Sequence, residues 1–488
     1  MKVLKSNVAS FVLATLLSTT TLSVSAQGLD TRVISGTVSD GENPIANVAV
    51  TDGQHIVTTD ENGFYSISTP VDSRFVYITT PAGYVVSVKD KTIPQFYQLL
   101  EGDKTTYDFK LTKNKHNDDK HTFVVHSDVQ VTSTADIKQY KTVVEDCRKT
   151  IDAINGDVFG LDCGDIVGDS PFLYPNYIDA VSALGIPMYR AIGNHDMDYY
   201  GRSHETSYHT FEKYFGPTVY SFNKGKAHYI VLNNNFFIGR DYFYMGYVDE
   251  KTFAWLEQDL ALVPKDNLIF IVMHIPSQLT NETQQFKYDY FSIADQTVNA
   301  RALHQLFKSH ETHIITGHMH YNLNMEFGDK IMEHNTASAC GTWWQIPECL
   351  DGTPRGYAVY EVDQNQVEWY YKGAEYDRNY QMRVYGVGQD DDFPTDVVVN
   401  VWNYDSKWKV ELFEDGKKTA DMTKFSGYDQ YTKILCSDRS KVKYDWIYPT
   451  KNDHMFRATP KNPNAKLQVK VTDRFGNIYT QDINPTQE

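Results

Sequence analysis

Cysteine is scarce in this chain of 488 residues, which has five: Cys147, Cys163, Cys340, Cys349 and Cys436. An odd count cannot pair completely, and no two lie at the CxxC spacing of a zinc cluster. Cys340 and Cys349 could form one bridge in an oxidising compartment. We expect at least three of the five to be buried free thiols, so the sequence excludes a disulfide scaffold.

Positive charge is also in short supply. The chain carries 46 lysines and arginines against 63 acidic residues, which gives a formal net charge of -17. An acidic surface repels nucleic acid and anionic membranes, so we expect neither as the main partner. A local cationic centre, such as a metal site, would still attract a phosphate group.

Long apolar runs are confined to the N-terminus. Lys2 and Lys5 precede the apolar stretch at residues 11–17, and a small-x-small pattern ends at Ala26. This arrangement predicts a signal peptide over residues 1–26, with a short buried helix as the alternative. No later run approaches the ~20 apolar residues of a membrane span. We therefore expect an exported bacterial protein, periplasmic or secreted, with no membrane span.

The expected pattern of secondary structure changes twice along the remaining chain. Residues 27–113 show short alternating strands with frequent turn residues, which predicts a small β-sandwich. Residues 114–380 alternate strands with helices, as in an α/β domain with a buried central sheet. From residue 381 to 488 we expect strands only, and a second β-sandwich.

Polar residues follow the apolar strands expected in the central domain. They are Asp128, Gly164-Asp165, Gly193-Asn194-His195-Asp196, His274 and Gly317-His318-Met319-His320. An open α/β sheet builds its site outside the carboxyl ends of its strands, so these side chains should converge. Glycine before an acid, amide or imidazole permits the sharp turns that direct such groups into one site.

In this order the five segments resemble the DxH, GDxx, GNH(D/E), H and GHxH motifs of the calcineurin-like metallophosphoesterase superfamily. The resemblance covers about 250 central residues. The sequence from Thr210 to Asn234 is similar to that of the exported bacterial branch of the family. In that branch the catalytic domain lies between two β-domains. The segment GTVSDGENPIANVAVTDG is similar to carboxypeptidase-regulatory-like modules, which fits the N-terminal domain.

The resemblance implies a four-layer α/β/β/α sandwich with two divalent metal ions, of manganese, iron or zinc, at the sheet edge. One ion would be held by Asp128, Gln130, Asp165 and His320, and the other by Asp165, Asn194, His274 and His318. Asp165 would bridge both ions. Mixed oxygen and nitrogen ligands do not choose among the three metals.

The implied reaction is hydrolysis of a small phosphomonoester or phosphodiester by a metal-bridging hydroxide. His195 would assist the leaving group, and either Asp196 or Asp169 would orient it. Gly168 stands where purple acid phosphatases carry tyrosine, so no tyrosinate ligand is expected. The alternative is an inactive surface or periplasmic binding protein whose β-domains recognise glycan or protein.

Several residues keep two interpretations at this stage. Gln130 stands where the family usually has histidine. Trp343 and Trp344 either stack on a substrate or pack in the core. Tyr199 and Tyr200 either line the pocket or lie on the surface. Arg355 is a further candidate for a phosphate contact.

Overall fold

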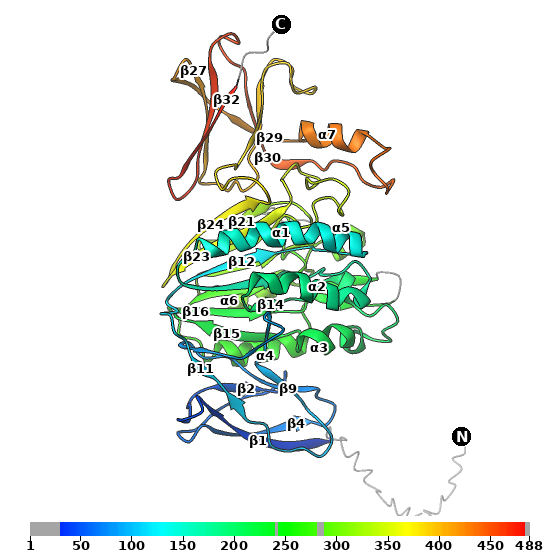
Figure 1. Ribbon diagram of the computed structural model, residues 1–488, viewed down its shortest axis with the longest axis vertical. Coiled ribbons are helices and arrows are strands. Elements are labelled where there is room, and N and C mark those ends of the chain that lie inside the picture. Colours follow the sequence, from blue (N-terminus) through cyan, green and yellow to red (C-terminus); the bar gives the residue numbers. More distant parts are fainter. Residues whose placement is uncertain (1–29, 240–242, 281–286, 484–488) are drawn as a thin grey trace, which may run out of the picture.

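The structure is a computed structural model that describes residues 30–239, 243–280 and 287–483. The expected signal peptide lies outside the described residues. The described chain forms a central α/β layer structure with one β-domain at each end of its long axis (Figure 1). Among the described residues, no helix is long and apolar enough to cross a membrane.

The N-terminal domain consists of two small sheets that pack face to face. One contains β10 (Phe109–Lys110), β1 (Thr31–Ser39) and β4 (Phe64–Pro70), and the other β3 (Ile56–Thr58), β2 (Ala49–Thr51), β5 (Phe75–Ile78) and β9 (Tyr97–Leu99). The two short strand pairs β11 (Thr112–Lys113) with β6 (Tyr84–Val85) and β7 (Val88–Lys89) with β8 (Ile93–Pro94) complete it. Alternate residues of β1 and β4 are buried, which is the pattern that the sequence indicated.

Two larger sheets form the middle of the molecule. The first has the order β14 (Met188–Arg190), β13 (Asp157–Asp162), β12 (Lys120–His126), β23 (Gly356–Asp363) and β24 (Gln366–Gly373). The second has the order β15 (Tyr220–Lys224), β16 (Ala227–Val231), β19 (Leu268–Val272), β20 (Thr312–Thr316), β22 (Ile331–Asn335) and β21 (Leu323–Phe327). The predicted site residues follow strands that run parallel to one another within each sheet. In the first sheet β12, β13 and β14 are parallel, and in the second β16, β19 and β20 are parallel.

Aromatic side chains fill the space between the two sheets. Phe123 of β12 stacks on Tyr360 of β23 with ring centroids 4.8 Å apart, and it meets Phe270 of β19 edge to face at 5.0 Å. All three rings are buried. Because β12 and β19 belong to different sheets, this cluster fixes how the sheets face each other.

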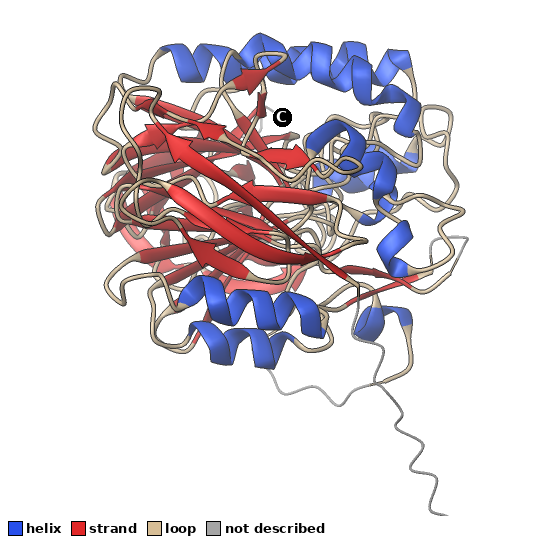
Figure 2. Ribbon diagram, turned by 90° about the horizontal axis from the view of Figure 1, so that it is seen from below, coloured by secondary structure: helices blue, strands red, loops and turns tan. Residues whose placement is uncertain are grey.

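Helices cover the outer face of each sheet. On one side lie α1 (Thr134–Asp152) and α2 (Tyr174–Val181), and on the other α4 (Glu250–Leu260) and α6 (Ala300–Phe307). Helices therefore flank the strands above and below when the molecule is seen end-on (Figure 2). The four-layer α/β/β/α fold is confirmed. The shorter elements α3 (His209–Phe215), α5 (Tyr290–Ile293), β17 (Asn235–Phe237) and β18 (Tyr244–Gly246) lie in the loops at the strand ends.

The C-terminal domain again pairs two sheets. These are β25 (Arg383–Tyr385), β26 (Val397–Asn400), β30 (Asn452–Ala458) and β29 (Thr423–Gly427), and β28 (Lys417–Asp421), β27 (Lys409–Glu414), β31 (Leu467–Thr472) and β32 (Ile478–Ile483). The expectation of strands only is wrong in one element, because α7 (Gln430–Ser437) follows β29. The side chain of Asp429 caps this helix by accepting from the backbone N–H of Thr432.

Candidate metal centre

The predicted site residues lie at the carboxyl ends of the strands, on one edge of the sandwich. Asp128 follows β12, Asp165 follows β13, and Asn194 follows β14 in the first sheet. His274 follows β19 and His318 follows β20 in the second. The site therefore spans both sheets at the edge that the sequence indicated.

Close approach of the chain segments depends on two glycines. A Cβ on Gly193 would lie 2.1 Å from Oδ1 of Asp165, and a Cβ on Gly317 would lie 1.9 Å from Oγ of Ser127. Neither contact is possible for a larger residue without displacing the site. The glycines therefore serve close packing of the loops, where the sequence indicated only sharp turns.

Backbone strain is concentrated at the same place. Six site residues have positive φ values although they are not glycine: Asp128, Gln130, Asp165, Asp169, His318 and His320. Each such conformation costs about 1–3 kcal/mol and persists only where the surrounding structure holds it. This clustering is typical of a functional site.

Three of the predicted ligands lie close enough together to bind one metal ion. Ligand atoms of Asp165, His274 and His318 all lie within 4.8 Å of one another. Nε2 of His274 is 3.2 Å from Oδ2 of Asp165 and 3.0 Å from Oδ1 of Asn194. Nδ1 of His274 donates to the carbonyl of Cys163, which leaves Nε2 as the nitrogen directed at the group.

Asp128 and His320 form the second half of the site. Nε2 of His320 is 3.3 Å from Oδ1 of Asp128, and both side chains are buried. Asp128 also accepts hydrogen bonds from the backbone N–H of His318 and the hydroxyl of Ser127. Burial alone would raise the pKa of Asp128, but the neighbouring His320 imidazole outweighs it and lowers that pKa.

Asp165 connects the two halves. Its Oδ1 accepts from the backbone N–H of His195 at 2.8 Å, and its Oδ2 accepts from Nε2 of Gln130 at 2.8 Å. Burial would raise its pKa, but the imidazoles of His274 and His195 hold the pKa of Asp165 well below its usual range. A carboxylate that stays ionised at the centre of both groups is suited to bridge two cations.

The donor set fits two divalent metal ions. The amide oxygen of Gln130 is buried and accepts no hydrogen bond from the residues described. A buried acceptor without a donor is costly, and a cation would satisfy it once the amide rotates away from its hydrogen bond to Asp165. The carboxylates, amides and imidazoles are the oxygen and nitrogen ligands that manganese, iron and zinc accept.

His195 differs from the other imidazoles in its exposure. About 27% of its side chain is accessible, whereas His274 is fully buried and His320 is 3% exposed. Its Nδ1 is 3.0 Å from Oδ1 of Asp169. Burial would lower its pKa, but Asp165 and Asp169 raise the pKa of His195 above its ordinary value.

Asp196 has a different role in the structure. Its carboxylate accepts hydrogen bonds from the backbone N–H groups of Gly193, Ile166 and Val167, and from the hydroxyl of Tyr174. Of the two acids that the sequence left open, Asp169 therefore lies against the ring of His195, and Asp196 holds the two loops together.

The remaining candidates separate into site and core. Trp344 is 7% exposed and donates from Nε1 to the carbonyl of Val129, so it packs in the core. The ring of Trp343 lies against the ring of His320, with centroids 4.5 Å apart and the planes tilted by 35°. Arg355 contacts Gln139 of α1 and the ring of Trp344 rather than the predicted ligands.

A cavity of about 610 Å³ begins at Asp169. Tyr199, Tyr200, Arg202 and His209 line it. Both tyrosines line this hollow together with Asp169, and Tyr200 is 92% exposed, so its ring also lies on the surface.

Asp295 was missed by sequence reasoning. Its Oδ1 is 3.8 Å from Nε2 of His318, whose Nδ1 faces His274 at 3.2 Å. It follows α5 in a loop and ends no strand, so no periodic pattern marks it. A carboxylate behind a ligand histidine orients the ring.

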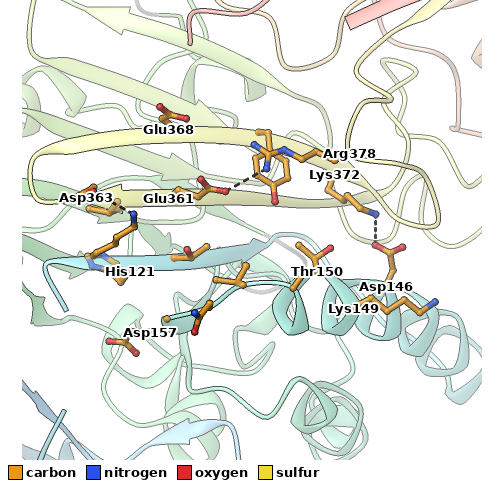
Figure 3. A pocket seen from close by; sticks show the side chains of 18 of the residues that line it. His121, Asp146, Lys149, Thr150, Asp157, Glu361, Asp363, Glu368, Lys372 and Arg378 are labelled. Atoms are coloured by element: carbon orange, nitrogen blue, oxygen red, sulfur yellow. Dashed lines mark hydrogen bonds and ion pairs between the residues drawn. The ribbon is translucent and has the colours of Figure 1, made fainter. Parts of the chain in front are cut away.

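A second cavity, of about 790 Å³, lies at the opposite end of the sheet (Figure 3). His121 lines it, and His121 and Asp128 lie at opposite ends of β12. Its lysines and arginine are largely engaged in ion pairs: Lys372 with Asp146, Arg378 with Glu361 and Lys120 with Asp363. We therefore do not place the metal site there.

All five cysteines are buried and free. The bridge considered between Cys340 and Cys349 is therefore absent. Sγ of Cys340 instead lies 3.9 Å from Nδ1 of His320, and Sγ of Cys349 lies 3.3 Å from the hydroxyl of Ser338. The thiol of Cys340 therefore packs behind the predicted ligand His320.

Comparison with known families agrees with this geometry. The family model for the calcineurin-like phosphoesterase matches residues 121–322. The models for the N-terminal and C-terminal parts of calcineurin-like phosphoesterases match residues 32–114 and 333–479. The chain belongs to the calcineurin-like phosphoesterases, which are metal-dependent hydrolases of phosphoric esters, and it carries the flanking domains at both ends.

Solved structures show more distant similarity. A dimetal phosphatase from Danio rerio is 13% identical, with 52% of this chain and 96% of that chain covered and a TM-score of 0.34. A purple acid phosphatase from yellow lupin is 11% identical, with 71% and 68% covered and a TM-score of 0.38. A 5'-nucleotidase from Candida albicans is 16% identical, with 54% and 53% covered and a TM-score of 0.30. These similarities are too low to indicate a substrate. No curated protein sequence matches the chain.

Proposed function

We propose that the protein is an exported phosphoesterase that hydrolyses a phosphomonoester or phosphodiester of a small substrate at a two-metal centre. The observation that carries the proposal is the position of His195. It is a partly exposed imidazole beside a buried group of carboxylates and imidazoles, and its backbone N–H donates to the central Asp165. The expected N-terminal signal peptide supports export.

Each residue has a defined part in this proposal. Asp128, Gln130, Asp165 and His320 would hold one ion, and Asp165, Asn194, His274 and His318 the other. Two divalent ions at such a centre neutralise the charge of the phosphoryl group and activate water for in-line attack. Manganese, iron and zinc all suit the donors.

His195 would deliver a proton to the leaving oxygen. The carboxylate of Asp169 binds Nδ1, so Nε2 is the nitrogen that carries the transferred proton. The buried imidazoles cannot take this part, because their free nitrogens face the carboxylates of the site.

The test compares wild type with His195→Ala after loading with Mn²⁺, Zn²⁺ or Fe²⁺. Aryl phosphomonoesters and diesters serve as substrates, and elemental analysis gives the metal content. We expect hydrolysis by wild type and a loss of about 10²- to 10⁴-fold in kcat in the variant at equal metal content. Equal and negligible rates, with less than about one metal per chain, would favour the binding-protein alternative.

A further inference from the structure

A path of aromatic contacts leads from the metal centre to the C-terminal domain. Trp343 lies on the ring of His320 with centroids 4.5 Å apart. Trp446 meets Trp343 at 4.5 Å with the ring planes at 87°, and Tyr444 stacks on Trp446 at 5.1 Å and 10°. Two ring contacts therefore join a predicted metal ligand to the segment that follows α7. In Figure 1, α7 lies above the same side of the central domain as α5, which belongs to the strand-end loops.

The segment that presents Trp446 is firmly attached to the catalytic domain. The backbone N–H groups of Lys443 and Tyr444 donate to Oε1 of Gln345. Arg439 closes the segment by donating to the carbonyls of Ile447 and Tyr444. A small apolar cluster lies beneath it, formed by Ile346, Cys436, Val442 and Ile447. The position of Trp446 is thus fixed by contacts other than its own.

The position of Trp343 is fixed as well. Trp343 and Trp344 have φ values of 45° and 62°, which are strained for residues with large side chains. Trp344 anchors the pair in the core through its hydrogen bond to Val129. Because Trp344 is fixed in the core, the strained backbone at this pair directs the side chain of Trp343 away from the core and against His320.

Trp446 remains 53% exposed despite these contacts. An exposed indole on an anchored segment contributes little to folding, because much of its apolar surface stays in water. Its perpendicular contact with Trp343 forms a corner of two aromatic surfaces beside the metal centre. A flat ring can stack on one surface of such a corner and place its edge against the other.

We propose that Trp446 and Trp343 form a subsite for the organic group of the phosphoester, and that this group carries a ring with an apolar face. The inference rests on the proposed phosphoesterase activity and names its substrate class. Trp446 is then a specificity-determining residue that the C-terminal domain contributes to the active site. An aryl group and the apolar face of a sugar ring both have the required chemistry, since each can stack on an indole.

The experiment measures kcat and KM of wild type, Trp446→Ala and Trp446→Phe on phenyl phosphate, glucose 1-phosphate and glycerol 3-phosphate. We expect Trp446→Ala to lower kcat/KM for a ring substrate about tenfold, mainly through KM. We expect the acyclic glycerol ester to change less than twofold, and Trp446→Phe to retain most of the ring preference. Loss for phenyl phosphate alone assigns the subsite to aryl groups, and loss for glucose 1-phosphate alone assigns it to sugars.

Phe64→Ala is the matched control, because Phe64 is an exposed aromatic residue of the N-terminal domain at 45% exposure. It should leave all three substrates unchanged. Equal ring preference in wild type and Trp446→Ala, with both folded and metal-loaded, would overturn the subsite.

A binding measurement separates the subsite from the catalytic proposal. Phenylphosphonate, which cannot be hydrolysed, is titrated into each metal-loaded protein by calorimetry. A dissociation constant that rises about tenfold in Trp446→Ala supports the subsite even if no ester is hydrolysed. Unchanged binding together with normal hydrolysis refutes the subsite and leaves the phosphoesterase proposal standing.

Discussion

Nδ1 of His195 lies 3.0 Å from Oδ1 of Asp169, and the backbone N–H of Asp169 donates in return to the carbonyl of His195. The two residues come from the loops after β14 and β13, so this exchange fixes the distance between the loops. It also fixes which ring nitrogen of His195 faces away from Asp169. The same pair thus sets both the position and the tautomer of the proposed proton donor.

Asp169→Asn should lower kcat by about ten- to a hundred-fold, because an amide no longer favours the protonated, correctly oriented ring of His195. Metal content should be unchanged. Steady-state kinetics with elemental analysis check this.

Asp196→Asn is the contrasting variant. It should lower the free energy of unfolding by about 2 kcal/mol, since an amide cannot accept all the backbone hydrogen bonds of Asp196. Equal kinetic effects of the two variants would contradict the separation of roles.

Gln130→His should raise the affinity for Zn²⁺ at the first metal position. The amide oxygen of Gln130 is a neutral, harder ligand than imidazole, and it favours ions such as Mn²⁺. Calorimetric titration of the metal-free protein with Zn²⁺ and Mn²⁺ measures the change. The amide of Gln130 now donates to Asp165, so it must rotate to present its oxygen. Unchanged Zn²⁺ affinity would place Gln130 outside the ligand set.

Asp295→Asn should weaken metal binding by about ten- to a hundred-fold, because the carboxylate behind His318 orients that ligand. The dissociation constant for Mn²⁺ or Zn²⁺ is the readout. Asp289→Asn is the control in the same loop region, since the described contact of the Asp289 carboxylate is a hydrogen bond from the backbone N–H of Ser292. Equal effects of both variants would show a general loop effect instead.

Gly193→Ala should abolish metal loading, whereas a glycine with free space around its Cα should tolerate the same change. The added methyl group would meet Oδ1 of Asp165 at 2.1 Å, and that atom cannot move without leaving the site. Gly239→Ala provides the comparison, because among the described residues its added methyl group would meet Phe243 at an ordinary 3.8 Å. Metal stoichiometry and thermal unfolding should separate the two variants. Full loading of Gly193→Ala would contradict the close approach.

Acid should destabilise the fold through a buried histidine pair. Nδ1 of His313 is 2.9 Å from Nε2 of His334, and Nδ1 of His334 is 2.9 Å from Oδ1 of Asn324, a hydrogen-bond chain that two neutral rings can form. Burial lowers the pKa of His313 to about 3. In the unfolded chain the imidazole of His313 takes up a proton near pH 6.5, whereas in the folded chain it stays unprotonated at that pH. The stability is therefore present above about pH 6.5 and is lost as the pH falls from there towards 3.

This group alone should lower the free energy of unfolding by about 2 kcal/mol between pH 7 and pH 5. Urea unfolding of wild type and His313→Gln at both pH values measures the difference. The decrease should be smaller in His313→Gln than in wild type. His116→Gln, at an exposed position, should keep the wild-type pH dependence. A full decrease in His313→Gln would show that other groups cause it.

Strand ends were readable from the sequence because apolar runs stop abruptly at polar residues such as Asp128 and His274. This pattern, with the family resemblance, indicated the four-layer fold, which the structure confirms. Asp295 and Trp446 left no such signal, since each reaches the site through contacts between distant segments. Helix α7 has one local sign, the cap at Asp429, but its 8 residues are too few to show a clear helical period.

The two central sheets include strands from late in the sequence. Strand β22 pairs with β20, and β23 pairs with β12, although both lie beyond the segment matched by the central family model. A fragment cut after residue 322 would therefore lose a neighbour of a central strand in each sheet and expose two unpaired edges. Expression of the catalytic part by itself must extend at least to Gly373. Even that fragment would lack the indole of Trp446, so its substrate range would not report that of the whole enzyme.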